Sequence, residues 1–128
     1  MPLKPIVYAN LLKYYLDKHK SEVYLVNTGW VGGAYGVGKR ISINDTRTIV
    51  SAAQDGIGNA SFRHDKIFNL SVPTNISGIK SNILTPRNLW SDKNDYDSKA
   101  RKLVSLFIEN FARFKDIPEN IIHSGPIL

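Results

Sequence analysis

Apolar side chains recur every three or four residues in two stretches of the chain, and this spacing predicts two amphipathic helices. The first spans Pro5 to Lys18, where a proline suits the opening turn and basic residues suit the last one. The second spans Asp95 to Phe114 and carries the longer apolar stripe. We expect the members of this stripe to lie in the core: Leu103, Leu106, Phe107, Phe111 and Phe114.

Two shorter apolar runs between these helices have the length and composition of buried strands. They cover residues 23–27 and 67–72, and Pro73 ends the second. Residues 40–43 also look extended. We therefore expect strands to alternate with helices, which is typical of a mixed α/β chain.

A third helix is expected where Asn44 or Asp45 can act as the N-cap and Gly56 as the stop. Residues 74–94 contain prolines, a glycine and several Asn and Ser, so they predict a connector with short turns. Residues 117–128 are expected to add one short helical turn.

Composition narrows the class of protein. Hydrophobic residues make up 42% of the 128, and no apolar run approaches the ~20 residues of a membrane span. Cysteine is absent, which excludes disulfides and thiolate metal sites and fits a cytoplasmic protein. The net charge of +6 is dispersed, so we expect a solvated basic surface and no nucleic-acid partner. One unit over residues 1–128, with no membrane partner, is the simplest organisation.

A glycine-rich loop follows the first predicted strand, as in many nucleotide sites: residues 29–38 contain five of the nine glycines. The segment GAYGVGKR at 33–40 matches G-x-x-x-x-G-K and then departs from a phosphate-binding loop. Arg40 stands where a Ser or Thr must ligate Mg²⁺. Such a loop must also open a helix, whereas residues 41–43 look extended. A phosphate-binding loop is therefore not expected.

Other candidate chemistry is sparse. The three histidines lie far apart and share no metal-ligand spacing. His64 and Asp65 form an acid–base pair on paper, but a polar loop is the favoured interpretation. From the residues alone, the chain offers a loop suited to an anion or a nucleotide and no catalytic set.

Several blocks of this sequence resemble the C-terminal region of ATP-dependent phosphoenolpyruvate carboxykinases. They cover essentially the whole chain: PIVYA at 5–9, LVNTGW at 25–30, YGVGKR at 35–40, DTR at 45–47, FNL at 68–70, VPT at 72–74, ILTPR at 83–87 and LFIENF at 106–111. The family's fold is a two-domain α/β structure with the active site between the domains. The resemblance implies that this chain is a C-terminal portion of the ATP-binding domain, excised or truncated from a longer protein.

The resemblance also implies an activity in gluconeogenesis. Family members are cytoplasmic enzymes that convert oxaloacetate and ATP to phosphoenolpyruvate, ADP and CO₂, using Mg²⁺ with ATP and a second ion, typically Mn²⁺. Their phosphate-binding loop, metal ligands and substrate-binding arginines lie upstream of the region matched here. We therefore expect no catalytic and no metal-ligating residue in this chain, and no turnover by the chain alone.

Three ATP-binding residues carry over by position. The resemblance places Arg40 and Ile41 at the adenosine end of ATP and gives Thr46 a further nucleotide contact. A guanidinium can stack on a base, an isoleucine can supply an apolar wall, and a threonine a hydroxyl. A surface cation and a helix-start residue are the plainer interpretations of Arg40 and Thr46.

Two alternatives remain beside this hypothesis. The chain is either a weak nucleotide-binding module, or an inert structural fragment that needs the missing N-terminal part. The second alternative predicts exposed apolar surface, and hence self-association.

Overall fold

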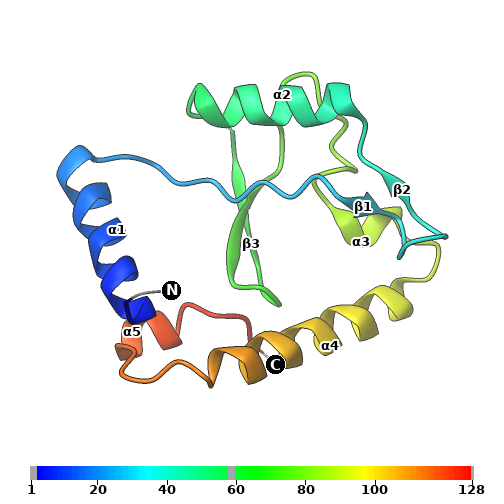
Figure 1. Ribbon diagram of the computed structural model, residues 1–128. Coiled ribbons are helices and arrows are strands. Elements are labelled where there is room, and N and C mark those ends of the chain that lie inside the picture. Colours follow the sequence, from blue (N-terminus) through cyan, green and yellow to red (C-terminus); the bar gives the residue numbers. More distant parts are fainter. Residues whose placement is uncertain (1–2, 58–59, 128) are drawn as a thin grey trace.

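The computed structural model describes residues 3–57 and 60–127. Its elements follow one another as α1 (Pro5–His19), β1 (Trp30–Val31), β2 (Lys39–Arg40), α2 (Ile43–Gln54), β3 (Phe62–Asp65), β4 (Leu70–Pro73), α3 (Pro86–Leu89), α4 (Lys93–Phe111) and α5 (Glu119–Ile122). The strands form two separate antiparallel ribbons, β1–β2 and β3–β4. Figure 1 shows α2 and α4 at opposite ends of the β3–β4 ribbon, with α1 standing apart from it.

The β3–β4 ribbon pairs Phe62 with Pro73 at one end and Asp65 with Leu70 at the other. The side chain of Asp65 stabilises the turn between the two strands, because its carboxylate accepts hydrogen bonds from the amides of Ile67 (3.0 Å) and Phe68 (2.9 Å). The strand predicted over residues 67–72 therefore begins only at Leu70. The partner strand β3 was not predicted.

The small core is divided between the side of α2, where Ile76 lines a pocket together with residues of that helix, and α4, which carries Ala100 and Val104. Its buried apolar residues are Ile76, Leu84, Ala100 and Val104. Arg63 links strand β3 to the segment that precedes α3, because its Nη2 donates to the carbonyl of Leu84 at 2.9 Å. The predicted connector contains the short helix α3, which packs against α4.

The predicted strand at residues 23–27 is wrong. The structure has no regular element between α1 and β1, and Leu25 in this stretch is 86% exposed. A strand needs a neighbouring strand to pair its amides and carbonyls, and within the described residues this stretch has none. An apolar run alone did not specify that partner.

The predicted core stripe of α4 is also wrong in large part. Leu103, Leu106 and Phe107 are each roughly half exposed, whereas Ala100 and Val104 of the same helix are buried. The helix itself was predicted correctly, although it starts two residues earlier than expected. Asp92 caps the helix, because its carboxylate accepts hydrogen bonds from the amides of Asn94 and Asp95.

The exposed surface is large for a chain of this mass. The solvent-accessible area is 9952 Å², whereas a compact monomer of 14.4 kDa has about 6,800 Å². Helix α1 accounts for part of the difference, because none of its residues is buried. Across the described ranges, no helix is long and apolar enough to cross a membrane.

Candidate functional site

A pocket of about 560 Å³ lies where β2 leads into α2. Six residues line it: Thr28, Arg40, Ile41, Ser42, Ile43 and Thr46. The structure thus brings together all three residues that the sequence analysis selected. The volume is within the range of small-molecule sites.

Ser42 builds one wall of this pocket by starting α2. Its hydroxyl accepts a hydrogen bond from the amide of Asp45 (3.0 Å) and donates to the Asp45 carboxylate (2.7 Å). Its carbonyl accepts from the amide of Thr46 at 2.9 Å. The prediction that Asn44 or Asp45 caps this helix is therefore wrong. The S-x-x-D spacing was a usable signal, because it is a variant of the capping box.

The backbone of Ile41 is partly committed. Its amide donates to the carbonyl of Gly29 at 3.1 Å, which continues the β1–β2 ladder by one pair. Of its two backbone groups, the carbonyl is therefore the one that can serve a ligand. The half-buried side chain contributes an apolar surface to the pocket.

Arg40 supplies the charge of the site. It lies on β2, is exposed, and its guanidinium forms no ion pair with any carboxylate in residues 3–57 and 60–127. The other pocket-lining residues are uncharged. A permanently charged donor group in the lining of the pocket, without an ion-pair partner in the described residues, favours an electron-rich ligand.

The glycine-rich loop is folded on itself beside this pocket. The carbonyl of Ala34 accepts from the amides of both Val37 (3.0 Å) and Gly38 (2.8 Å). The chain then continues as the strand β2 and not as a helix. Amides that are bonded within the loop cannot cradle a phosphate, which agrees with the failed motif.

The comparisons with known proteins decide the family. A family model described as phosphoenolpyruvate carboxykinase matches residues 1–82. The chain belongs to this family. The family resemblance inferred from the sequence is confirmed. The mixed α/β class is supported as a mix of helices and small antiparallel ribbons.

Curated relatives among the carboxykinases match nearly the whole chain. The phosphoenolpyruvate carboxykinase (ATP) of Caldanaerobacter subterraneus subsp. tengcongensis is 48% identical over 127 residues, 98% of this chain and 24% of the relative. That of Fusobacterium nucleatum is 47% identical over 98% of this chain and 24% of the relative. That of Campylobacter lari is 51% identical over 93% and 23%. The chain thus spans about a quarter of the length of these carboxykinases.

A second pocket lies along α2. Its volume is about 680 Å³, and its lining includes Arg47 and Thr48 of the helix, Asp55 directly after the helix, and Asn75 from the segment after β4. Two of its polar groups are already bonded within the chain. The Thr48 hydroxyl donates to the carbonyl of Asn44 (3.0 Å), and the Asn75 side chain accepts from the amide of Ser61 (3.0 Å). This pocket is larger, but none of the three sequence-selected residues lines it.

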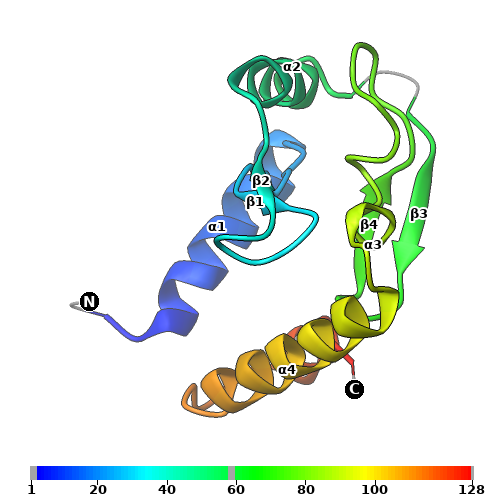
Figure 2. The same cartoon turned by 90° about the vertical axis from the view of Figure 1, so that its right-hand side faces the viewer.

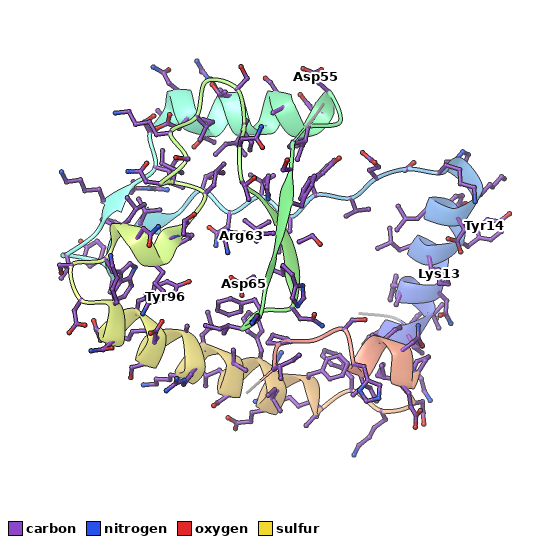
Figure 3. The ribbon with its side chains drawn as sticks, turned by 180° about the vertical axis from the view of Figure 1, so that it is seen from behind. Lys13, Tyr14, Asp55, Arg63, Asp65 and Tyr96 are labelled. Carbon is purple, nitrogen blue, oxygen red and sulfur yellow. The ribbon has the colours of Figure 1, made fainter. Side chains whose placement is uncertain are left out.

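His64 and Asp65 do not form an acid–base pair. They are neighbours on β3, so their side chains point to opposite faces, and the Asp65 carboxylate is engaged in the turn. Figure 3 shows Asp65 close to Arg63 and to Tyr96 of α4. Burial raises the pKa of the Tyr96 hydroxyl, and the nearby Asp65 charge raises it further. This cluster joins β3 to α4 and serves the fold.

Proposed function

We propose that this chain contributes the adenosine side of the ATP site of a phosphoenolpyruvate carboxykinase. Arg40, Ile41 and Thr46 are the nucleotide contacts. The observation that supports the proposal is their convergence: residues from a strand, a linker and a helix line one pocket, and the one cation in its lining forms no ion pair within residues 3–57 and 60–127.

Each of the three residues has a separate role in this proposal. The Arg40 guanidinium stacks on the base or donates to its ring acceptors. The Ile41 carbonyl accepts a hydrogen bond from the base, and its side chain forms an apolar wall. The Thr46 hydroxyl, in the first turn of α2, bonds a polar group of the adenosine.

The parent reaction follows from the family. We infer that the family-length protein is a carboxy-lyase of gluconeogenesis that turns oxaloacetate and ATP into phosphoenolpyruvate, ADP and CO₂, with Mg²⁺ and Mn²⁺ as its metals. The chain described here does not fit those metals. Over residues 3–57 and 60–127, no three His, Cys, Asp or Glu side chains come together as metal ligands. No catalytic step is assigned to this chain.

We expect the chain alone to be inactive for the same reason. Phosphoryl transfer depends on positioned cations and metals around the phosphates, and this pocket offers a single cation. Formation of phosphoenolpyruvate is measured with purified chain, oxaloacetate, ATP and both metals. Turnover above background would overturn the assignment of an inactive adenosine-side module.

Binding of ATP tests the site directly. An NMR titration of the chain is expected to show shifts at Arg40, Ile41 and Thr46 with a millimolar dissociation constant, about −4 kcal/mol. Arg40→Ala is expected to weaken binding about tenfold. The control is Arg47→Ala, which removes the same charge from a residue that lines the other pocket. Equal losses in the two variants would show that charge alone attracts ATP and would refute the site.

A second candidate function is supported by the exposed apolar surface. We infer that the uncovered faces of α1 and α4 are packing surfaces for the part of a family-length polypeptide that this chain does not match. Val7, Leu11 and Leu12 of α1 are all exposed, and α1 forms no extensive contact with another described element. Unpaired apolar faces of this size mark sites of interaction or self-association.

Co-expression with the unmatched part of one curated relative tests this second candidate. We expect a one-to-one complex, and we expect Leu11→Glu to weaken it because a charge is poorly tolerated in an apolar interface. Lys13→Glu, on the same exposed helix, is the control. Association of the chain only with itself, or a monomer that ignores the added polypeptide, would contradict it.

A further inference from the structure

The glycine-rich hairpin has no role in the site as described so far, although it is the most distinctive stretch of the sequence. We propose that it positions Arg40 through two aromatic side chains, Trp30 of β1 and Tyr35 at the loop tip. The inference rests on the proposed adenosine site. It assigns positioning roles to two residues outside the lining of the pocket.

The register of the ribbon places Trp30 directly opposite Arg40. The next pair along the ladder is hydrogen-bonded, because the amide of Ile41 donates to the carbonyl of Gly29. Hydrogen-bonded and non-hydrogen-bonded pairs alternate in an antiparallel ribbon, so Trp30 and Arg40 form a non-hydrogen-bonded pair. The side chains of such a pair leave the same face of the ribbon and lie closer together than in a hydrogen-bonded pair.

The loop tip brings a second ring to this face. Tyr35 packs edge-on against Trp30, with ring centroids 5.2 Å apart and an angle of 79° between the ring planes. Tyr35 is otherwise 85% exposed, so the packing against Trp30 is its main anchorage. Figure 2 shows the loop as a wide turn beyond β1 and β2.

The glycines make this return of the loop sterically feasible. A Cβ on Gly38 would run into the carbonyl oxygens of Gly33 and Val31 (2.7 Å to the latter), so the two arms of the loop approach at backbone distance. Position 36 favours glycine for another reason. No neighbouring atom would crowd a Cβ there, but the φ of 87° is unfavourable for other residues. The loop is thus closed by its own backbone and holds Tyr35 over Trp30.

This arrangement has a consequence for Arg40. A free arginine on a two-residue strand samples many rotamers and loses that freedom when it binds a ligand. An indole on the same face, backed by the Tyr35 ring, excludes part of those rotamers and offers a flat surface for the guanidinium. The hairpin thereby reduces the entropy that Arg40 loses on contact with the base.

A ring-current measurement tests the positioning without any nucleotide. In the free protein, the side-chain protons of Arg40 are expected to resonate upfield of their usual positions, because the register places Arg40 on the face of the ribbon that carries the indole. Trp30→Leu is expected to abolish the upfield shift, and Tyr35→Leu to reduce it. Tyr35→Phe keeps the ring and is expected to keep the shift, as is Val37→Ala, the control at an equally exposed tip position. Usual positions for the Arg40 protons in the wild-type chain would overturn the proposal.

ATP binding supplies the second measurement. Tyr35→Leu and Trp30→Leu are expected to weaken ATP binding roughly three- to tenfold, with Tyr35→Phe and Val37→Ala at the wild-type value. If Trp30→Leu fails to fold, Tyr35→Leu at the exposed tip carries the test. Unchanged affinity in a variant that has lost the upfield shift would overturn the positioning role. A wild-type chain that shows the shift but ignores ATP would refute the proposed function while leaving the aromatic contact intact.

Discussion

Helices α1 and α4 show the same kind of sequence pattern and have opposite fates in the structure. Both are amphipathic, and both were predicted from the spacing of their apolar residues. Helix α4 packs against α3 and buries Val104 completely, whereas α1 buries none of its residues. An apolar face predicts that a helix packs against another segment, but it does not identify that segment. For α4, part of the packing partner is α3 of the same chain, whereas no described element buries a residue of α1.

The largest expected effect tests the packed helix. Val104→Asp places a carboxylate at a fully buried position and is expected to lower the free energy of unfolding by more than about 3 kcal/mol. A loss of that size is a large fraction of the roughly 5–15 kcal/mol that stabilise a typical domain, so the unfolding midpoint is expected to fall sharply. Urea denaturation followed by circular dichroism measures the change.

The matched control for this change is Leu12→Asp on α1. Leu12 is 58% exposed, so the same charge is expected to change the free energy of unfolding by no more than about 0.5 kcal/mol. Similar losses in the two variants would mean that α1 is packed in solution, and the contrast between the helices would be lost.

A smaller effect is expected at the start of α2. This helix lies outside the comparison of α1 with α4 and carries part of the candidate site. Ser42→Ala removes both hydrogen bonds between this side chain and Asp45 and is expected to cost about 1 kcal/mol. Thermal unfolding measures the loss, and ATP titration should show weaker binding because Thr46 lies in the turn that Ser42 caps. Ser51→Ala in the last turn of the same helix is the control, and a loss there as large as at Ser42 would argue against a capping role.

The smallest effect concerns the ion pair that joins α3 to α4. The Arg87 guanidinium donates to both carboxylate oxygens of Asp97 at 2.8 Å and holds the pKa of that carboxyl below its usual value. A carboxyl whose pKa is lower in the folded state stabilises the fold above its unfolded pKa of about 4. That stability is lost as the pH falls through the unfolded value towards the lower folded one.

Asp97→Asn is therefore expected to lower the thermal midpoint at pH 7 and to leave it nearly unchanged near pH 2. Asp17→Asn removes the same charge from the unpacked helix α1, where the partner Lys13 is also exposed. We expect this control to lower the thermal midpoint at pH 7 by less than Asp97→Asn does, because an exposed ion pair contributes little to stability. A parallel profile for the two variants would mean that the Arg87 pair does not couple α3 to α4 in solution.

The fold could be predicted where local signals suffice. The bounds of α1 agree to one residue, because Pro5 and the basic end residues are helix-terminus signals read within one turn. Helix α4 was also predicted, but its predicted start lies two residues too late, because Asp92 was not recognised as its N-cap. Strand β3 was missed because a side-chain turn at Asp65 separates it from β4, and no glycine or proline marks that turn.

The candidate site was predictable only in part. Arg40, Ile41 and Thr46 were selected by resemblance, and the structure brings them to one pocket. Thr28 carried no usable signal, since its place in the lining depends on the pairing of β1 with β2. The pairing of Trp30 with Arg40 could not be predicted either, because the loop length alone leaves the register of the ribbon open.

The sequence by itself determined the three longer helices, the bounds of α1 to one residue, the failure of the phosphate-loop motif and the family. Each of these depends on residues close together along the chain or on their identity. Only the tertiary structure decided which apolar faces are buried, that residues 23–27 have no pairing partner in the described ranges, and that the glycine loop returns Tyr35 to Trp30. The physical reason is that burial and strand pairing are contacts between segments, and a pattern within one segment does not contain its partner.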